Sequence, residues 1–209
     1  MKDTSSPGPD GFGPAFFKRN WNLVKNDLMC VLQDFHSLAD LRPINKSFIV
    51  LLPKKAGANR PDNFRPISLQ NCCLKISTKC LTLRLKSLMP NLVHPDQTRF
   101  IFGRAIAENF VYAAGIVQAC NKRSAPAAVF KLDFRKAFDS ISWDVLDRIL
   151  EAKGFPELWR AWVRNLNLSS QTAVLLNGVP GRWIQCRRGL RQGDPLSPFL
   201  FDIVVDILQ

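Results

Sequence analysis

The ten residues GLRQGDPLSP at positions 189–198 combine a glycine turn, a polar pair and a proline that can open a helix. Asp194 stands where it can cap a helix that starts at Pro195, because an aspartate in that place accepts hydrogen bonds from free backbone N–H groups. Gln192 and Gly193 leave an amide side chain and uncovered backbone free to contact a ligand. The stretch therefore predicts an exposed binding loop in front of a last helix, which we expect over residues 195–209.

A second informative stretch is KLDFRKAFD at positions 131–139. It follows an apolar run, so we expect a strand over residues 127–134 with Asp133 at its end. Phosphoryl transfer needs divalent ions to neutralise phosphates, and such ions need carboxylates on a rigid element. Asp133 is therefore a candidate catalytic and metal-binding residue, and the alternative is that it caps the next turn.

Apolar spacing in the first half of the chain predicts helices around two strands. Residues 48–52 and 64–68 are expected to be extended and joined by a basic, turn-rich loop. Residues 106–117 have the spacing of an amphipathic helix. Six apolar residues at alternating steps of four and three predict one long earlier helix (Phe17, Trp21, Val24, Leu28, Val31 and Phe35).

A helix over residues 69–89 is expected to have two distinct sides. Its apolar side would carry Cys73, Ile76, Cys80 and Leu83, and a basic side would carry Lys75, Lys79 and Lys86. The basic side is a candidate phosphate-facing stripe.

The second half of the chain predicts helices over 143–153 and 156–168, broken at Gly154. Strands over 172–176 and 183–187 flank an Asn177-Gly178 turn, with a loop longer than two residues. The order strand, helices, hairpin, helix predicts an α+β lobe with an antiparallel sheet and helices on one face. The turn-rich residues 122–126 divide the chain into a basic lobe over 1–125, with its N-terminal helix, and a sheet-containing lobe over 126–209.

The net charge of +12 is concentrated in one segment. Between Arg42 and Arg104, twelve basic residues accompany two aspartates, which accounts for ten of the net charges. One basic surface predicts salt-sensitive nucleic-acid binding through release of counterions from phosphates, and the alternative is a solubilising face.

The six cysteines form no C-x-x-C pair and have only two histidines to complement them, which argues against zinc. They indicate small core residues of a reduced, intracellular protein. No apolar run has membrane-spanning length and the N-terminus has no signal-peptide pattern, so we expect no membrane partner. A nuclear location is compatible with these features, and the sequence does not indicate an oligomeric state.

The two stretches at 131–139 and 189–198, together with FRPIS at 64–68 and FGR at 102–104, resemble the reverse transcriptases of non-LTR, LINE-type retrotransposons. The resemblance extends over nearly the whole chain, with the elements in the family's order. It implies a right-hand polymerase fold, in which 1–125 is fingers-like and 126–209 is part of the palm. It also implies RNA-directed DNA synthesis with two Mg²⁺ ions, an RNA template, a DNA primer and deoxynucleoside triphosphates.

By the same resemblance, a carboxylate of Asp133 and the backbone carbonyl of Phe134 bind metal, and the ring of Phe138 excludes a ribose 2′-hydroxyl. The alternative for Phe138 is a core residue. Gln192 and Gly193 would line the nucleotide. The remaining implied contacts are to the triphosphate, from Arg65 with Lys54 or Lys55, and to the template path, from Arg104, which is otherwise an ordinary helix-flanking charge.

The family's aromatic-x-Asp-Asp hairpin is absent from the sequence, which ends at Gln209. Asp202 and Asp206 lie four apart in the expected last helix and are interpreted as an ordinary polar stripe. The resemblance therefore predicts the fingers and first part of the palm, cut from a longer reading frame or decayed, and inactive as a polymerase when isolated. The alternatives are a noncatalytic nucleic-acid-binding relic and a group II intron maturase-like domain.

Overall fold

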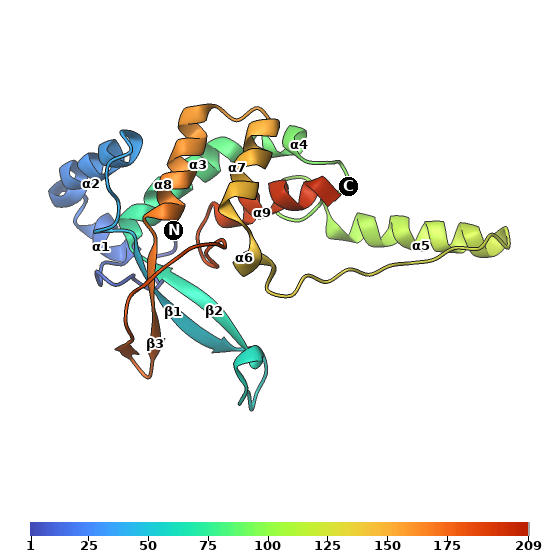
Figure 1. Cartoon of the computed structure of the whole chain (residues 1–209), viewed down its shortest axis with the longest axis horizontal. Coiled ribbons are helices and arrows are strands. Elements are labelled where there is room, and N and C mark those ends of the chain that lie inside the picture. The colour runs from blue at the N-terminus through green and yellow to red at the C-terminus, as the bar shows by residue number, and fades with distance from the viewer. Residues whose placement is uncertain (209) are drawn as a thin grey trace.

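Strands from distant parts of the chain meet in one sheet, in a computed structural model that describes residues 1–208 (Figure 1). Strand β1 (Lys46–Pro53) pairs antiparallel with β2 (Phe64–Gln70), and the loop between them carries a short 3₁₀ turn at Pro61–Asn63. Strand β1 also pairs in parallel with β3 (Gln171–Leu176). The two expected early strands and their basic loop are confirmed.

The sheet is mixed, whereas the sequence predicted an antiparallel one. Its order is β2-β1-β3-β4, and β5 also pairs with β3. The parallel contact joins a strand before residue 125 to one after residue 126, so the two expected lobes share this sheet. Periodicity reports which residues alternate in a strand and not which strand lies alongside, so the sequence could not show this pairing.

The hairpin after β3 turns more tightly than expected. Asn177 and Gly178 have φ values of 51° and 82°, and Leu176 pairs directly with Val179. This is a two-residue turn, of the kind that Asn-Gly favours because both central residues need positive φ. It produces the short strands β4 (Val179–Pro180) and β5 (Ile184–Gln185).

The N-terminal apolar stripe forms two helices where one was expected. Helix α1 (Pro14–Arg19) ends at Asn20, whose side-chain amide donates to the carbonyl of Phe16, and α2 (Trp21–His36) follows. An asparagine that bonds to the local backbone competes with helix continuation, which accounts for the break. Of the six stripe residues, Leu28 and Phe35 are buried.

Helix α3 (Cys72–Lys86) and the short α4 (Met89–Leu92) replace the single helix expected over 69–89, because residues 69 and 70 belong to β2. The predicted apolar side of α3 is wrong, since Cys80 and Leu83 are exposed. The helix instead buries a side that mixes leucines with small hydroxyl residues (Leu74, Ser77, Thr78, Leu81, Thr82 and Leu85). Those hydroxyls bond to backbone carbonyls of their own helix, as Thr82 does to Thr78 at 2.7 Å, so their burial leaves them satisfied.

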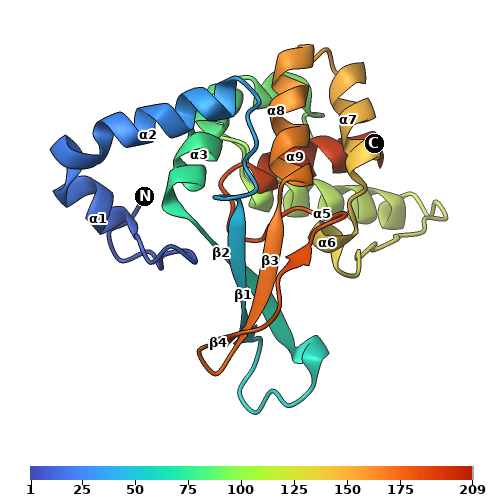
Figure 2. The same ribbon diagram turned by 60° about the vertical axis from the view of Figure 1, so that its left-hand side comes forward.

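Helices α7 (Trp143–Ala152), α8 (Glu157–Leu168) and α9 (Ser197–Val205) pack with α3 at one end of the sheet (Figure 2). Leu146, Leu150 and Ile203 are among their fully buried side chains. Gly154, with φ of 77°, allows the expected turn between α7 and α8. The last helix is shorter than expected and ends in a 3₁₀ turn at Asp206–Leu208.

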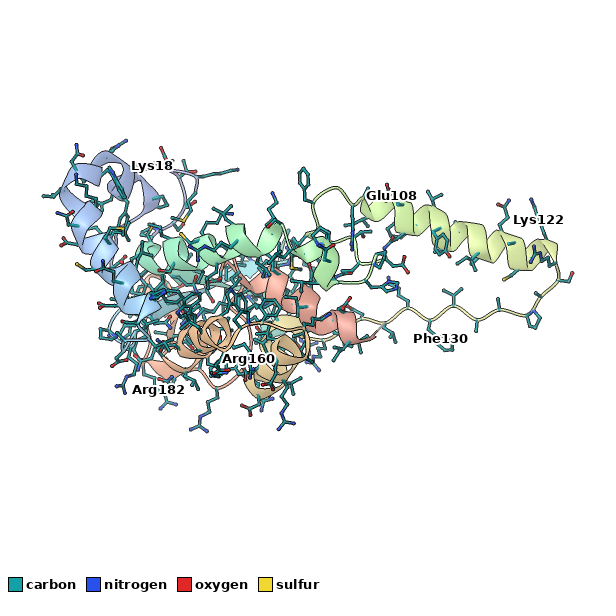
Figure 3. The ribbon with its side chains drawn as sticks, turned by 90° about the horizontal axis from the view of Figure 1, so that it is seen from above. Lys18, Glu108, Lys122, Phe130, Arg160 and Arg182 are labelled. Atoms are coloured by element: carbon teal, nitrogen blue, oxygen red, sulfur yellow. The ribbon has the colours of Figure 1, made fainter. Side chains whose placement is uncertain are left out.

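Helix α5 (Ile106–Lys122) and the chain that returns from it form an arm that projects from the body (Figures 1 and 3). The helix is where the sequence placed it, but none of its residues is buried. The strand predicted over 127–134 is wrong: Val129, Phe130 and Leu132 are at least 77% exposed on an irregular segment. A strand needs a neighbour for its N–H and C=O groups, and the element that runs beside this segment is helix α5 (Figure 1).

The structure therefore has mixed α/β content, with a sheet and packed helices, as the sequence predicted at that level of detail. Within residues 1–208, no helix combines the length and the apolar character needed to cross a membrane.

Candidate nucleotide-binding groove

Hydrogen bonds hold the loop at 189–193 against the short helix α6 (Ala137–Ser140). The N–H of Gly189 donates to the carbonyl of Ile141, and that of Leu190 to the carbonyl of Phe138, both at 2.8 Å. The indole N–H of Trp143 donates to the carbonyl of Gly189 at 2.9 Å. These bonds connect the two sequence stretches that predicted the fold.

Two glycines let the loop approach its neighbours closely. A Cβ on Gly189, which has φ of 87°, would lie 2.9 Å from the backbone oxygen of Asp139. On the other side, the N–H of Ser68 donates to the carbonyl of Gln192 at 2.8 Å, and a Cβ on Gly193 would lie 3.0 Å from the oxygen of Ser68. The loop thus crosses from α6 to the free edge of β2, and side chains at these glycines would separate them.

Two half-buried charged residues support the loop. Arg191 donates to Asn45 at the start of β1, and burial lowers the pKa of its guanidinium. Burial also raises the pKa of Asp194, whose Oδ1 accepts the N–H of Leu196 at 2.7 Å. Asp194 therefore organises the turn before α9, but the helix begins at Ser197 and so Asp194 is not its cap as expected.

The loop, α6 and the segment after the arm surround an open groove of about 510 Å³. Five of the predicted site residues line it (Asp133, Phe134, Phe138, Gln192 and Gly193). Its size falls in the range of roughly 300–1,000 Å³ that small-molecule sites occupy.

An adjoining groove of about 710 Å³ shares Asp133, Phe134 and Gln192 and adds Lys54 and Arg65 from the ends of β1 and β2. Lys54 donates from Nζ to the carbonyl of Asp62 at 2.9 Å, whereas the exposed Lys55 lines neither groove. The structure therefore gathers seven of the eight predicted metal- and nucleotide-binding residues around two adjoining grooves; the eighth, Lys55, lies outside them.

Asp133 offers an exposed carboxylate on the border between the two grooves. A carboxylate and the neighbouring carbonyl of Phe134 are the oxygen donors that a hard divalent ion prefers, with water and phosphate completing the coordination. Over residues 1–208, no group of three histidine, cysteine, aspartate or glutamate side chains is close enough to hold a metal by itself. The donor chemistry thus suits a hard divalent ion whose remaining ligands come from elsewhere.

The ring of Phe138 both lines the groove and packs against α9. It stacks on Phe201, with ring centroids 4.6 Å apart and planes inclined by 14°. The two interpretations of Phe138, core residue and wall of the nucleotide site, are therefore compatible, because one face of the ring can pack while an edge remains in the groove.

Of the predicted nucleic-acid contacts, Lys79 and Lys86 are exposed on α3 and Lys75 is half-buried. The ammonium of Lys86 lies 5.0 Å from the centroid of the Phe102 ring. The guanidinium of Arg104 donates to three backbone carbonyls, of Pro90, His94 and Gln97, at 2.7–3.0 Å. Arg104 thereby closes the loop at the base of α5, a structural role that its position in the sequence did not reveal.

Asp202 and Asp206 do not form the ordinary polar stripe that the sequence predicted. Asp202 is 1% exposed: Oδ1 accepts from Gln97 at 3.0 Å, Oδ2 has no partner, and burial raises its pKa to about 7. Asp206 accepts from the N–H of His94 at 2.6 Å and from Lys153 at 2.5 Å. Helical spacing correctly placed them on one side of α9, but only tertiary packing shows that this side faces the 94–104 loop.

The family described as reverse transcriptase (RNA-dependent DNA polymerase) matches residues 52–209. The chain is 30% identical over 208 residues to the transposon TX1 uncharacterized 149 kDa protein of Xenopus laevis, which covers 99% of this chain and 16% of that protein. It is 30% identical to the Pol polyprotein of the type-2 retrotransposable element R2DM of Drosophila melanogaster, over 98% of this chain and 19% of that one.

A Pol polyprotein of a type-1 retrotransposable element R2 of Nasonia vitripennis is 29% identical over 97% of this chain and 19% of its own length. The chain thus spans less than a fifth of each of these three relatives. Divalent-metal dependence is general in the family. The chain belongs to the reverse transcriptase family and is a domain of the kind found in the polyproteins of non-LTR retrotransposons.

Proposed function

We propose that this chain provides the nucleotide-binding part of an RNA-directed DNA polymerase. In that reaction the 3′-hydroxyl of a DNA primer attacks the α-phosphate of a deoxynucleoside triphosphate opposite an RNA template, and pyrophosphate leaves. The observation that carries the proposal is the meeting of Asp133 and Phe138 from one segment with Gln192 from a distant one around one groove.

The two grooves suggest how a nucleotide would lie. Lys54 and Arg65 line only the second groove, so we place the triphosphate there, where Arg65 can make a bidentate contact and Lys54 a point-charge contact. Phe138 and Gly193 line only the first groove, so we place the sugar and base there. Asp133 and Phe134 border both grooves, between the phosphates and the sugar.

The oxygens of Asp133 and Phe134 would hold Mg²⁺, which when bound neutralises phosphate charge and lowers the pKa of the attacking hydroxyl. Arg65 and Lys54 orient the phosphates, and the ring of Phe138 leaves no room for a 2′-hydroxyl. The backbone at Gly193 allows the nucleotide to approach the loop, while the amide of Gln192 bonds to the nucleotide or its template base. Each of these roles orients the substrate, which is the main task of a protein in phosphoryl transfer.

Fingers and palm are assigned on the same basis. Strands β1 and β2 carry the phosphate-binding cations and correspond to fingers, and the segments bearing Asp133 and Gln192 correspond to part of the palm, as in the division into 1–125 and 126–209. The template, the primer and deoxynucleoside triphosphates are the proposed partners, with the α3 lysines contacting nucleic acid.

A noncatalytic nucleic-acid-binding module is the second candidate. It is favoured by one observation: among the described residues, Asp133 belongs to no group of three histidine, cysteine, aspartate or glutamate side chains that could hold a metal. Such a module would bind nucleic acid through the basic surface and would not bind a nucleotide in a metal-dependent way.

Equilibrium binding of a fluorescent deoxynucleoside triphosphate, with and without Mg²⁺, separates the two candidates. We expect Mg²⁺ to strengthen binding, Asp133→Asn to abolish that gain, and Arg65→Ala to weaken binding about tenfold. We also expect Phe138→Ala to reduce the preference for deoxy- over ribonucleotide. Asp144→Asn, an exposed aspartate on α7, is the matched control. A gain from Mg²⁺ that persists in Asp133→Asn would reject the proposed site.

A further inference from the structure

Trp183 forms an exposed aromatic platform at the edge of the sheet. Its ring stacks on Phe48, with centroids 5.7 Å apart and planes inclined by 17°, and the ammonium of Lys46 lies 5.5 Å from its centroid. Nevertheless 42% of Trp183 remains exposed. One ring face is supported and the side chain still reaches solvent, which is the arrangement that a stacking ligand requires.

Strand alternation places this platform on the side of the sheet that faces away from the nucleotide groove. Ser47 and Ile49 of β1 line a hollow together with Gln192. Successive side chains of a strand point to opposite faces, so Lys46 and Phe48 point the other way. Trp183 stacks on Phe48 and therefore belongs to this second face.

The two sequence segments that form the platform are basic and lack carboxylates. Residues 168–193 contain four arginines and no acidic residue, and residues 41–61 contain five basic residues and no acidic one. Arg182 and Arg187, on either side of the short strand that follows Trp183, are exposed and make no ion pair within residues 1–208. Figure 3 shows Arg182 at the end of the molecule remote from the arm tip at Lys122.

We propose that Trp183, with Lys46, Arg182 and Arg187, binds single-stranded nucleic acid outside the nucleotide groove. A base would stack on the indole, and the cations would contact the phosphates on either side of it. A single strand fits because its bases offer free faces, whereas the bases of a duplex are already stacked. The proposal rests on the proposed function only for the class of ligand, a strand that a polymerase handles.

Fluorescence anisotropy of labelled twelve-nucleotide oligo(U) and oligo(dT) tests the platform, with a twelve-base-pair duplex as comparison. Trp183→Ala should weaken single-strand binding roughly 5- to 100-fold, as expected for loss of one stacked base, and change duplex binding less than about twofold. Trp183→Phe should keep most of the affinity. Unequal loss with oligo(U) and oligo(dT) would show which strand the platform prefers.

Trp21→Ala is the matched control, because Trp21 is 49% exposed on α2, away from the sheet. Equal affinity of Trp183→Ala and Trp21→Ala for single strands would overturn the proposal. Should Trp183→Ala fail to fold, crosslinking of wild-type chain to oligo(4-thiouridine) decides: attachment within residues 180–188 supports it, and attachment only elsewhere rejects it. Metal-dependent nucleotide binding measured on Trp183→Ala should be unchanged, so failure of the nucleotide site and failure of the platform give different results.

Discussion

Arg191 donates a hydrogen bond from Nη1 to Oδ1 of Asn45 at 2.6 Å, and so connects the binding loop to the first residue before β1. The amide nitrogen of Asn45 donates in turn to the carbonyl of Leu166 and to Oγ of Ser169, each at 2.7 Å. Asn45 is completely buried. One side chain thus joins β1, the end of α8 and the loop that carries Gln192.

Replacement of Asn45 by alanine should therefore destabilise the whole domain and loosen the loop. Three hydrogen bonds are lost, and the partly buried carbonyl of Leu166 and guanidinium of Arg191 each lose a partner, so we expect the free energy of unfolding to fall by about 2–4 kcal/mol. Urea denaturation measures this change. Asn91→Ala, at an exposed position, is the control, and a loss no larger than that of the control would show that Asn45 does not organise the loop.

Gly193→Ala should disturb the groove by forcing the loop away from β2. The new Cβ would lie 3.0 Å from the oxygen of Ser68, on a backbone with φ of 113°. Gly57→Ala is the matched control, because Gly57 also has positive φ but no atom within 4 Å of the added Cβ. We expect Gly193→Ala to cost about 1–3 kcal/mol more than the control in urea denaturation, and to weaken nucleotide binding. Equal costs would mean that the loop moves freely from the strand.

The parts of the fold that follow local rules were predictable from sequence. The β1–β2 pair and the α7–α8 turn at Gly154 follow from spacing and turn residues within about thirty positions. The loop at 189–193 was predicted to be exposed, but only Gly193 of it is. The groove was predicted as a set of residues, and the structure brings most of them together. The sequence could not reveal the bonds between the loop and α6 or the parallel contact of β1 with β3, because both join residues more than forty positions apart.

Other predictions were wrong because the periodicity of a segment does not show what packs against it. An apolar run predicted a strand around Asp133, but the segment has no ladder partner among the described residues. The apolar side predicted for α3 omitted Thr78 and Thr82, which are buried with their hydroxyls bonded within the helix. A tryptophan in a predicted hairpin is ordinary, and the platform at Trp183 depends on Phe48 and Lys46, which are distant in sequence and lie against its ring.

Asp202 should make the stability of the domain fall as pH rises. Burial raises its pKa to about 7 from an ordinary value of 3.8, so between these values the folded state holds a proton that the unfolded state releases. Asp202→Asn removes this effect. We expect the variant to exceed wild type by about 2–4 kcal/mol at pH 8 and to match it near pH 4, in urea denaturation across pH.

Asp206→Asn should change the free energy of unfolding in the opposite direction to Asp202→Asn. Burial alone would raise the pKa of Asp206, but hydrogen bonds from His94 and Lys153 outweigh burial and hold that pKa below its usual value. The stabilisation from Asp206 is thus present above the unfolded pKa and lost as pH falls through the folded one. Its replacement should therefore destabilise the domain at neutral pH. The same pH profile for both variants would contradict the contrast between the two carboxylates.

The α3 lysines should govern how steeply binding to primer-template duplex depends on salt. Each phosphate contact releases a counterion, so the slope of log affinity against log salt reports the number of contacts. Changing Lys75, Lys79 and Lys86 to glutamine should reduce the slope by about 2–3 and weaken binding without sequence preference. The control changes Lys122, Arg123 and Lys131, three exposed cations of the arm, and removes the same charge elsewhere. If the two triple variants have the same slope, net charge and not the α3 stripe attracts the duplex.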